Sequence, residues 1–79
     1  MNSQQVHRRE NIRLIGFEFY KLVNVKEGIN AYELIRALRH RFPTRNINKY
    51  QVQHCINKGI LLGLVEIVST NPKCYRRVL

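Results

Sequence analysis

Four polar side chains recur at helical spacing in the second half of the chain: Tyr50, Gln53, His54 and Asn57. On a helix they share one flank, because residues three and four positions apart are neighbours. Gln and Asn amides can pair bidentately with adenine, whereas Tyr and His can donate one hydrogen bond or pack against a thymine methyl group. We therefore predict that this flank reads base edges in a major groove. A neutral, solvent-exposed helix face would have the same composition.

The basic residues favour the first interpretation. The 79 residues include 14 Lys and Arg against five acids, all Glu, for a net charge of +9. Residues 34–79 hold nine of the basic residues and a single acid, Glu66. A field concentrated in this way attracts a polyanion such as double-stranded DNA. The alternative is charge that only keeps the protein soluble, for which a net charge of about 2–8 suffices. We predict phosphate contacts from Arg36, Arg39, Arg45, Lys49, Lys58, Lys73, Arg76 and Arg77.

Catalysis and metal binding find little support. No Asp is present to orient a His, and the second half of the chain has no carboxylate pair. On a helix, His54 and Cys55 would point about 100° apart, which disfavours a thiolate–imidazole pair. The two Cys and three His lack the spacings of zinc ligands. We expect no enzymatic activity, cofactor, metal or small-molecule substrate, and we expect Cys55 and Cys74 to be reduced, buried thiols.

A capped helix must carry the polar flank. Asn48 is the predicted N-cap, since its side-chain oxygen can accept a hydrogen bond from an amide of the first turn. Gly63 suits the left-handed conformation that ends many helices. Apolar or small residues recur on the side opposite the flank and predict a buried stripe: Val52, Cys55, Ile56, Gly59 and Leu62.

A β-hairpin is predicted after this helix. Residues 64–68 form an apolar run, residues 69–72 supply turn chemistry, and residues 74–79 can return as an antiparallel strand. In its second strand, Tyr75 and Val78 are expected to pack. Earlier in the chain, Ile29 can add a short edge strand beside this hairpin.

The first half of the chain predicts two further helices. Residues 10–24 carry an inner stripe that includes Ile15 and Phe19. The outer side of that helix holds Leu14, Phe17 and Tyr20, a possible dimer or partner patch, although scattered exposed apolar residues are also normal. We expect residues 1–6 to be flexible.

The second helix has clear start and stop signals. Asn30 and Glu33 have the spacing of a capping box, and Pro43 ends the helix near Phe42. Leu34, Ile35, Leu38 and Phe42 form its predicted buried stripe. The turn that follows contains one apolar residue, Ile47, which can anchor it to the core.

The elements together predict an α+β fold with three helices and a C-terminal two-stranded hairpin in a single domain over residues 1–79. Their order, with the basic charge on the last three elements, resembles the winged helix-turn-helix class of DNA-binding domains, in which the hairpin is the wing. A chain of this length buries only about 60–65% of its unfolded surface. No segment approaches the ~20 apolar residues of a membrane span, and the N-terminus lacks the apolar region of a secretory signal. We expect a cytoplasmic protein without a membrane partner.

Residues 48–79 resemble the small fimbrial-operon regulators of enteric bacteria (PapI-like). The resemblance is carried by Tyr50-Gln51, the amphipathic run, and Gly63-Leu64-Val65-Glu66 at the start of the wing. The link at residues 42–47 is longer than the tight turn usual in that group. The resemblance implies a bacterial or phage transcriptional regulator whose third helix enters the major groove while the second helix and the wing touch the backbone.

Two other functions stay open. A basic winged helix can bind RNA or the ribosome by shape, although only Tyr50 offers an exposed ring for stacking on unpaired bases. A phage- or plasmid-borne inhibitor of a host complex could instead use Leu14, Phe17 and Tyr20 to contact its protein partner. A homodimer through the same patch is compatible with DNA binding, because paired domains read paired half-sites.

Overall fold

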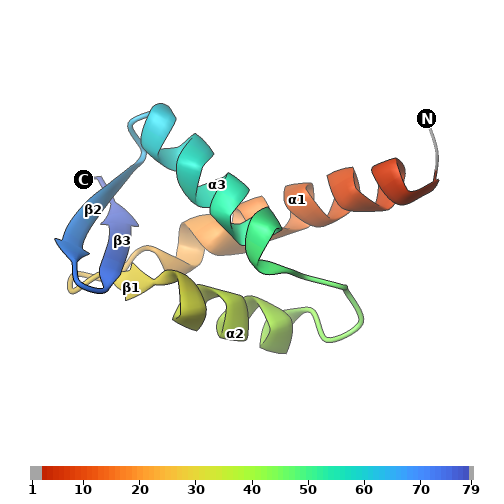
Figure 1. Ribbon diagram of the computed structural model, residues 1–79, viewed down its shortest axis with the longest axis horizontal. Coiled ribbons are helices and arrows are strands. Elements are labelled where there is room, and N and C mark those ends of the chain that lie inside the picture. The colour runs from red at the N-terminus through yellow and green to blue at the C-terminus, as the bar shows by residue number, and fades with distance from the viewer. Residues whose placement is uncertain (1–2, 79) are drawn as a thin grey trace.

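The computed structural model describes the backbone of residues 3–78 and the side chains of residues 12–78. The described part is a small α+β fold, as predicted. The elements follow in the order α1 (Ser3–Leu22), β1 (Ile29–Asn30), α2 (Ala31–Arg41), α3 (Lys49–Leu61), β2 (Val65–Thr70) and β3 (Lys73–Arg77). The antiparallel sheet has the strand order β1-β3-β2 and lies at the end of the molecule where α1 ends and α2 begins (Figure 1).

Helix α1 begins at Ser3, earlier than the predicted start at residue 10. The additional residues include Gln and Arg, which are good helix formers. Of the segment predicted to be flexible, residues 1–2 lie outside the described residues and residues 3–6 belong to α1. The predicted inner stripe is confirmed: Ile15 and Phe19 are buried, and Val23, just beyond the helix, is fully buried.

Helix α2 begins at the predicted cap. The Asn30 side-chain oxygen accepts a hydrogen bond from the Glu33 amide at 2.8 Å, and the Asn30 side-chain amide donates to the Glu33 carboxylate at 2.6 Å. Leu34 and Leu38 are buried. In the link to α3, Ile47 is buried as predicted, and Arg39 Nε donates a hydrogen bond to its carbonyl at 3.0 Å.

Hydrogen bonds cap helix α3 at both ends. Asn48 and Gln51 form a reciprocal capping box at its start. At its end, Gly63 has φ +74°, and the amides of Gly63 and Leu64 donate to the carbonyls of Ile60 and Gly59, which is the Schellman arrangement.

The buried stripe of α3 matches the prediction except at Leu62, whose side chain is 61% exposed. The prediction was wrong there because Leu62 is the C-cap residue and lies at the edge of the stripe, where α3 faces an open groove rather than the core.

The hairpin is longer than predicted. Strand β2 continues to Thr70, so the turn contains only Asn71 and Pro72. The predicted edge strand is confirmed, since Ile29 pairs with Tyr75 and Asn30 with Cys74. A register shift between residues 67 and 69 interrupts the pairing of β2 with β3.

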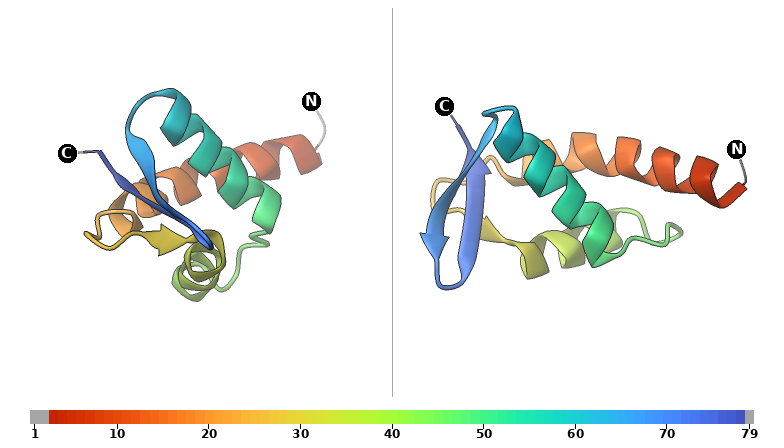
Figure 2. Two further views of the ribbon diagram at one scale, coloured as in Figure 1. Left: turned by 60° about the vertical axis from the view of Figure 1, so that its left-hand side comes forward. Right: turned by 45° about the horizontal axis from the view of Figure 1, so that its top comes forward.

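The core lies where the three helices meet the hairpin. Figure 2 shows that α3 crosses α1 and α2, while the hairpin turn lies beside the start of α2. Within the described residues, none of the helices combines the length and apolar character that crossing a bilayer requires. The buried apolar residues are Ile15, Phe19, Val23, Leu34, Leu38, Ile47, Val52, Cys55, Ile56, Val65 and Tyr75.

Candidate nucleic-acid interface

The outward flank of α3 presents the four predicted base-reading residues to solvent. Tyr50 is 69% exposed, and Gln53, His54 and Asn57 are exposed as well. The capping box fixes the start of the helix, and the buried stripe fixes its rotation. The flank contains no acidic residue, because α3 itself has none. A neutral hydrogen-bonding surface therefore faces outward along most of the helix.

Two of these residues are bonded to each other. Gln53 Nε2 donates a hydrogen bond to Asn57 Oδ1 at 2.9 Å. This leaves the Gln53 oxygen and the Asn57 amide hydrogens available for other partners. A bidentate contact of either amide with adenine would require this bond to open.

The flank ends in an apolar residue that the sequence analysis missed. Leu61 is 86% exposed and stands four residues after Asn57, so the two side chains lie on the same side of α3. The helical spacing that identified Tyr50 and Asn57 would also have found Leu61. Its methyl groups extend the flank towards the sheet.

The basic residues predicted to contact phosphates from α2, α3 and the link between them have different surroundings in the structure, and their contacts with phosphate remain predictions. Arg36 lies 6.0 Å from the centre of the Tyr32 ring, and Lys49 Nζ lies 5.2 Å from the centre of the Tyr50 ring. Both cations are exposed. Arg39 is exposed too, but its Nε donates a hydrogen bond to the Ile47 carbonyl. Arg45 is exposed on the link, and Lys58 is exposed on the side of α3 that faces α1.

The wing cations are more strongly engaged. Arg76 Nε contacts the Glu66 carboxylate at 2.7 Å, and Arg76 Nη1 donates to the Lys26 carbonyl at 3.0 Å. The Arg77 guanidinium stacks on the Tyr20 ring of α1 at 4.1 Å. Lys73 is exposed next to the hairpin turn. Of the three predicted wing contacts, Lys73 is therefore the one whose side chain is not engaged within the described part of the fold.

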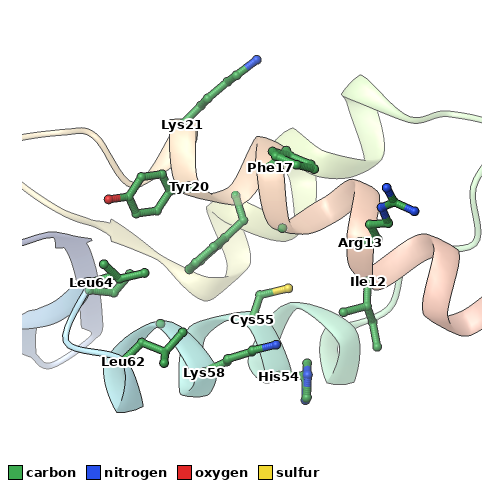
Figure 3. A pocket seen from close by; sticks show the side chains of 14 residues that line it. Ile12, Arg13, Phe17, Tyr20, Lys21, His54, Cys55, Lys58, Leu62 and Leu64 are labelled. Carbon is green, nitrogen blue, oxygen red and sulfur yellow. The ribbon is translucent and has the colours of Figure 1, made fainter.

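A groove separates α1 from α3 on the side away from α2. Its volume is about 810 Å³, and its walls are mainly apolar. Figure 3 shows Phe17 and Tyr20 on the α1 side and Lys58 and Leu62 on the α3 side, with Cys55 pointing into the space between them.

The structure brings only part of the predicted partner patch into this groove. Phe17, which is 72% exposed, and Tyr20 line it, whereas Leu14 does not. The sequence analysis placed Leu62 in the buried stripe and gave Leu64 no part in a binding site, but both form part of the opposite wall. They flank Gly63, and the sharp turn at that glycine places both beside α1.

Cys55 lies at the bottom of the groove as a buried free thiol. Burial raises its pKa above the ordinary value, and the nearby Lys58 ammonium opposes that shift only in part. The thiol is therefore protonated at neutral pH and is a poor nucleophile. The second free thiol, Cys74, is half-buried. No cluster of His, Cys, Asp or Glu within the described residues has an arrangement that could hold a metal ion.

No protein-family model matches this chain, and no curated protein or solved structure shows significant similarity to it.

Proposed function

We propose that the protein is a DNA-binding transcriptional regulator of the winged-helix type, in which α3 enters the major groove of double-stranded DNA. The observation that carries this proposal is the exposed, acid-free flank of α3 formed by Tyr50, Gln53, His54 and Asn57. Exposed cations are present on α3 itself, at Lys49, and on α2, at Arg36. The order of the helices and strands is compatible with the winged-helix arrangement.

The dimensions of α3 suit this role. Its 13 residues extend over ~20 Å, and a helix with side chains is about 10–12 Å across, close to the ~12 Å width of the major groove. Residues near the start of such a helix reach base edges most readily. Tyr50 and Gln53 occupy that region here. Leu61, at the other end, can pack against a thymine methyl group.

Phosphate contacts would then hold α3 in register. Arg36 on α2 and Lys49 at the start of α3 are exposed on either side of the link between the helices. Lys73 would add a contact from the hairpin turn. These residues position the protein without reading sequence, so the specificity rests on the flank of α3.

Selection from a random duplex library, followed by fluorescence anisotropy on the selected and scrambled sequences, tests this proposal. We expect the selected duplex to bind about 10³-fold or more tightly than the scrambled one. Replacing both amides, with Gln53→Ala and Asn57→Ala, should remove most of that preference and leave non-specific binding in place. Asn24→Ala, at an exposed loop position, is the matched control.

Two results would contradict the proposal. One is weak binding that depends on neither sequence nor salt, since even non-specific DNA binding is salt-dependent. The other is preferential binding of structured RNA in a direct competition with duplex DNA, which would favour the RNA-associated alternative.

A further inference from the structure

The groove between α1 and α3 is open to solvent, and its lining is mainly apolar. Phe17 and Leu62 are large apolar side chains exposed to solvent at its two sides, and the buried Phe19 and Cys55 lie at its floor. Exposed apolar surface of this kind marks an interaction site more often than scattered single residues do.

Gly16 supplies a second observation. It lies in the interior of α1 and lines the groove, and a Cβ atom added to it would meet no atom within 4 Å. Glycine in the interior of a helix is destabilising relative to alanine. Gly59 on α3 differs, because its Cβ would come within 2.8 Å of Val65. Packing within the fold therefore requires a glycine at position 59 but not at position 16. The missing side chain at Gly16 leaves room for another molecule to approach α1 closely.

The charge around the groove indicates what that molecule is. Arg13 and Lys58 line it together with His54, and no acidic side chain among the described residues does so. Lys21 extends outward from the α1 side (Figure 3). A second copy of this chain would bring another +9 of charge to the same place. The rim therefore favours an acidic partner over self-association.

The walls also indicate the conformation of the partner. Both long sides of the groove are helices, whose backbone amides and carbonyls are bonded internally, so an extended peptide would find few hydrogen-bond partners there. A helix needs none and can pack its apolar face into the space between two others. We propose that this groove binds an amphipathic helix of a partner protein, with apolar anchors against Phe17, Tyr20, Leu62 and Leu64 and with acidic residues facing Arg13 and Lys58.

The groove overlaps the proposed DNA-binding surface only in part. His54 and Lys58 line the groove, whereas Tyr50, Gln53 and Asn57 do not, and the apolar anchors belong to the groove alone. The inference therefore does not depend on the protein binding DNA.

A designed peptide tests the inference directly. The probe is a helix of about 18 residues, ~27 Å long, with Leu at positions i, i+3, i+4 and i+7 and Glu on the flanks of that stripe. A second peptide carries Lys in place of every Glu. We expect the Glu peptide to bind the full chain and to shift the amide resonances of groove residues in α1 and α3, and we expect the Lys peptide to show no binding.

Substitutions inside and outside the groove show where the Glu peptide binds. Gly16→Leu places a large side chain in the groove from the α1 wall. It should weaken the binding of the Glu peptide by about tenfold or more without lowering thermal stability, because Leu is a good helix former. Leu61→Gln removes an exposed Leu outside the groove and should leave binding unchanged. Lys58→Glu should weaken the Glu peptide and allow the Lys peptide to bind.

The inference is overturned if Gly16→Leu leaves binding intact or if the two peptides bind equally. It is also overturned if the free protein forms a dimer that Gly16→Leu abolishes, since the occupant would then be a second copy. Binding of anionic lipid vesicles with shifts at the same groove residues, in the absence of any peptide response, would assign the groove to a membrane surface and likewise reject the proposal.

Discussion

Gly16 and Gly59 face one groove from opposite helices, yet the fold makes different demands on them. Alanine at position 59 would bring its Cβ within 2.8 Å of Val65 Cγ2. That contact is closer than real Cβ atoms show, so the buried Val65 side chain or the helix would have to move. Alanine at position 16 meets open space and keeps its helical backbone.

We therefore expect opposite effects on stability from the same substitution. Gly59→Ala should lower the free energy of unfolding by about 1–2 kcal/mol, because overpacking outweighs the gain in helix propensity. Gly16→Ala should raise it by about 0.5–1 kcal/mol. Chemical denaturation of both variants beside the unmodified protein measures this difference. Equal changes of the same sign would show that Gly59 is not tightly packed against Val65.

At the scale of elements, the ends of the helices are fixed by local hydrogen bonds. Asn48 accepts a hydrogen bond from the Gln51 amide at 3.0 Å, and Gln51 Oε1 accepts one from the Asn48 amide at 3.2 Å. The first turn of α3 carries Tyr50, so the same bonds orient the proposed recognition surface.

Asn48→Ala should destabilise the protein by about 1 kcal/mol, because the first turn of α3 loses its cap. Thermal unfolding measures the loss, and Asn24→Ala serves as the control, since Asn24 is an exposed loop residue after α1. If the proposed function holds, Asn48→Ala should also weaken DNA binding more than its effect on stability explains. An unchanged melting temperature would mean that Gln51 and the buried stripe hold the first turn unaided.

Features that depend on residues close in the sequence could be predicted. The caps at Asn30 and Asn48, the turn at Gly63 and the edge strand at Ile29 each follow from a few neighbouring side chains. The start of α1 was placed too late, because its first residues lack an apolar stripe while still favouring a helix. The exposure of Leu62 and the groove itself depend on how far apart α1 and α3 lie, and a sequence pattern contains no measure of that separation.

For the whole molecule, the surplus of positive charge predicts how binding responds to salt. If about six cations contact phosphates, the logarithm of the binding constant should fall with the logarithm of salt concentration at a slope of roughly −5. The slope is proportional to the number of phosphates that the protein neutralises. It therefore distinguishes cations that contact DNA from cations that are paired with other groups of the protein.

Arg36→Ala and Lys73→Ala should each reduce the magnitude of this slope by about 1. Arg41→Ala should leave the slope unchanged, because the Arg41 side chain pairs with Glu18 of α1, with its Nε 3.8 Å from the carboxylate. Anisotropy titrations across a series of salt concentrations provide the slopes. A reduction with Arg41→Ala equal to that with Lys73→Ala would mean that only total charge matters and that no particular surface faces the DNA.

The last residues of the described chain connect the sheet to both walls of the groove. The Arg77 amide donates to the Val23 carbonyl at 2.9 Å, its guanidinium stacks on Tyr20, and the Val78 amide donates to the Leu64 carbonyl at 2.9 Å. A displacement of β3 would therefore move the Tyr20 wall and the Leu64 wall together. If binding of DNA at the hairpin and binding of a partner helix in the groove both displace β3, the two events are thermodynamically linked. Each ligand then changes the protein's affinity for the other ligand by the same factor.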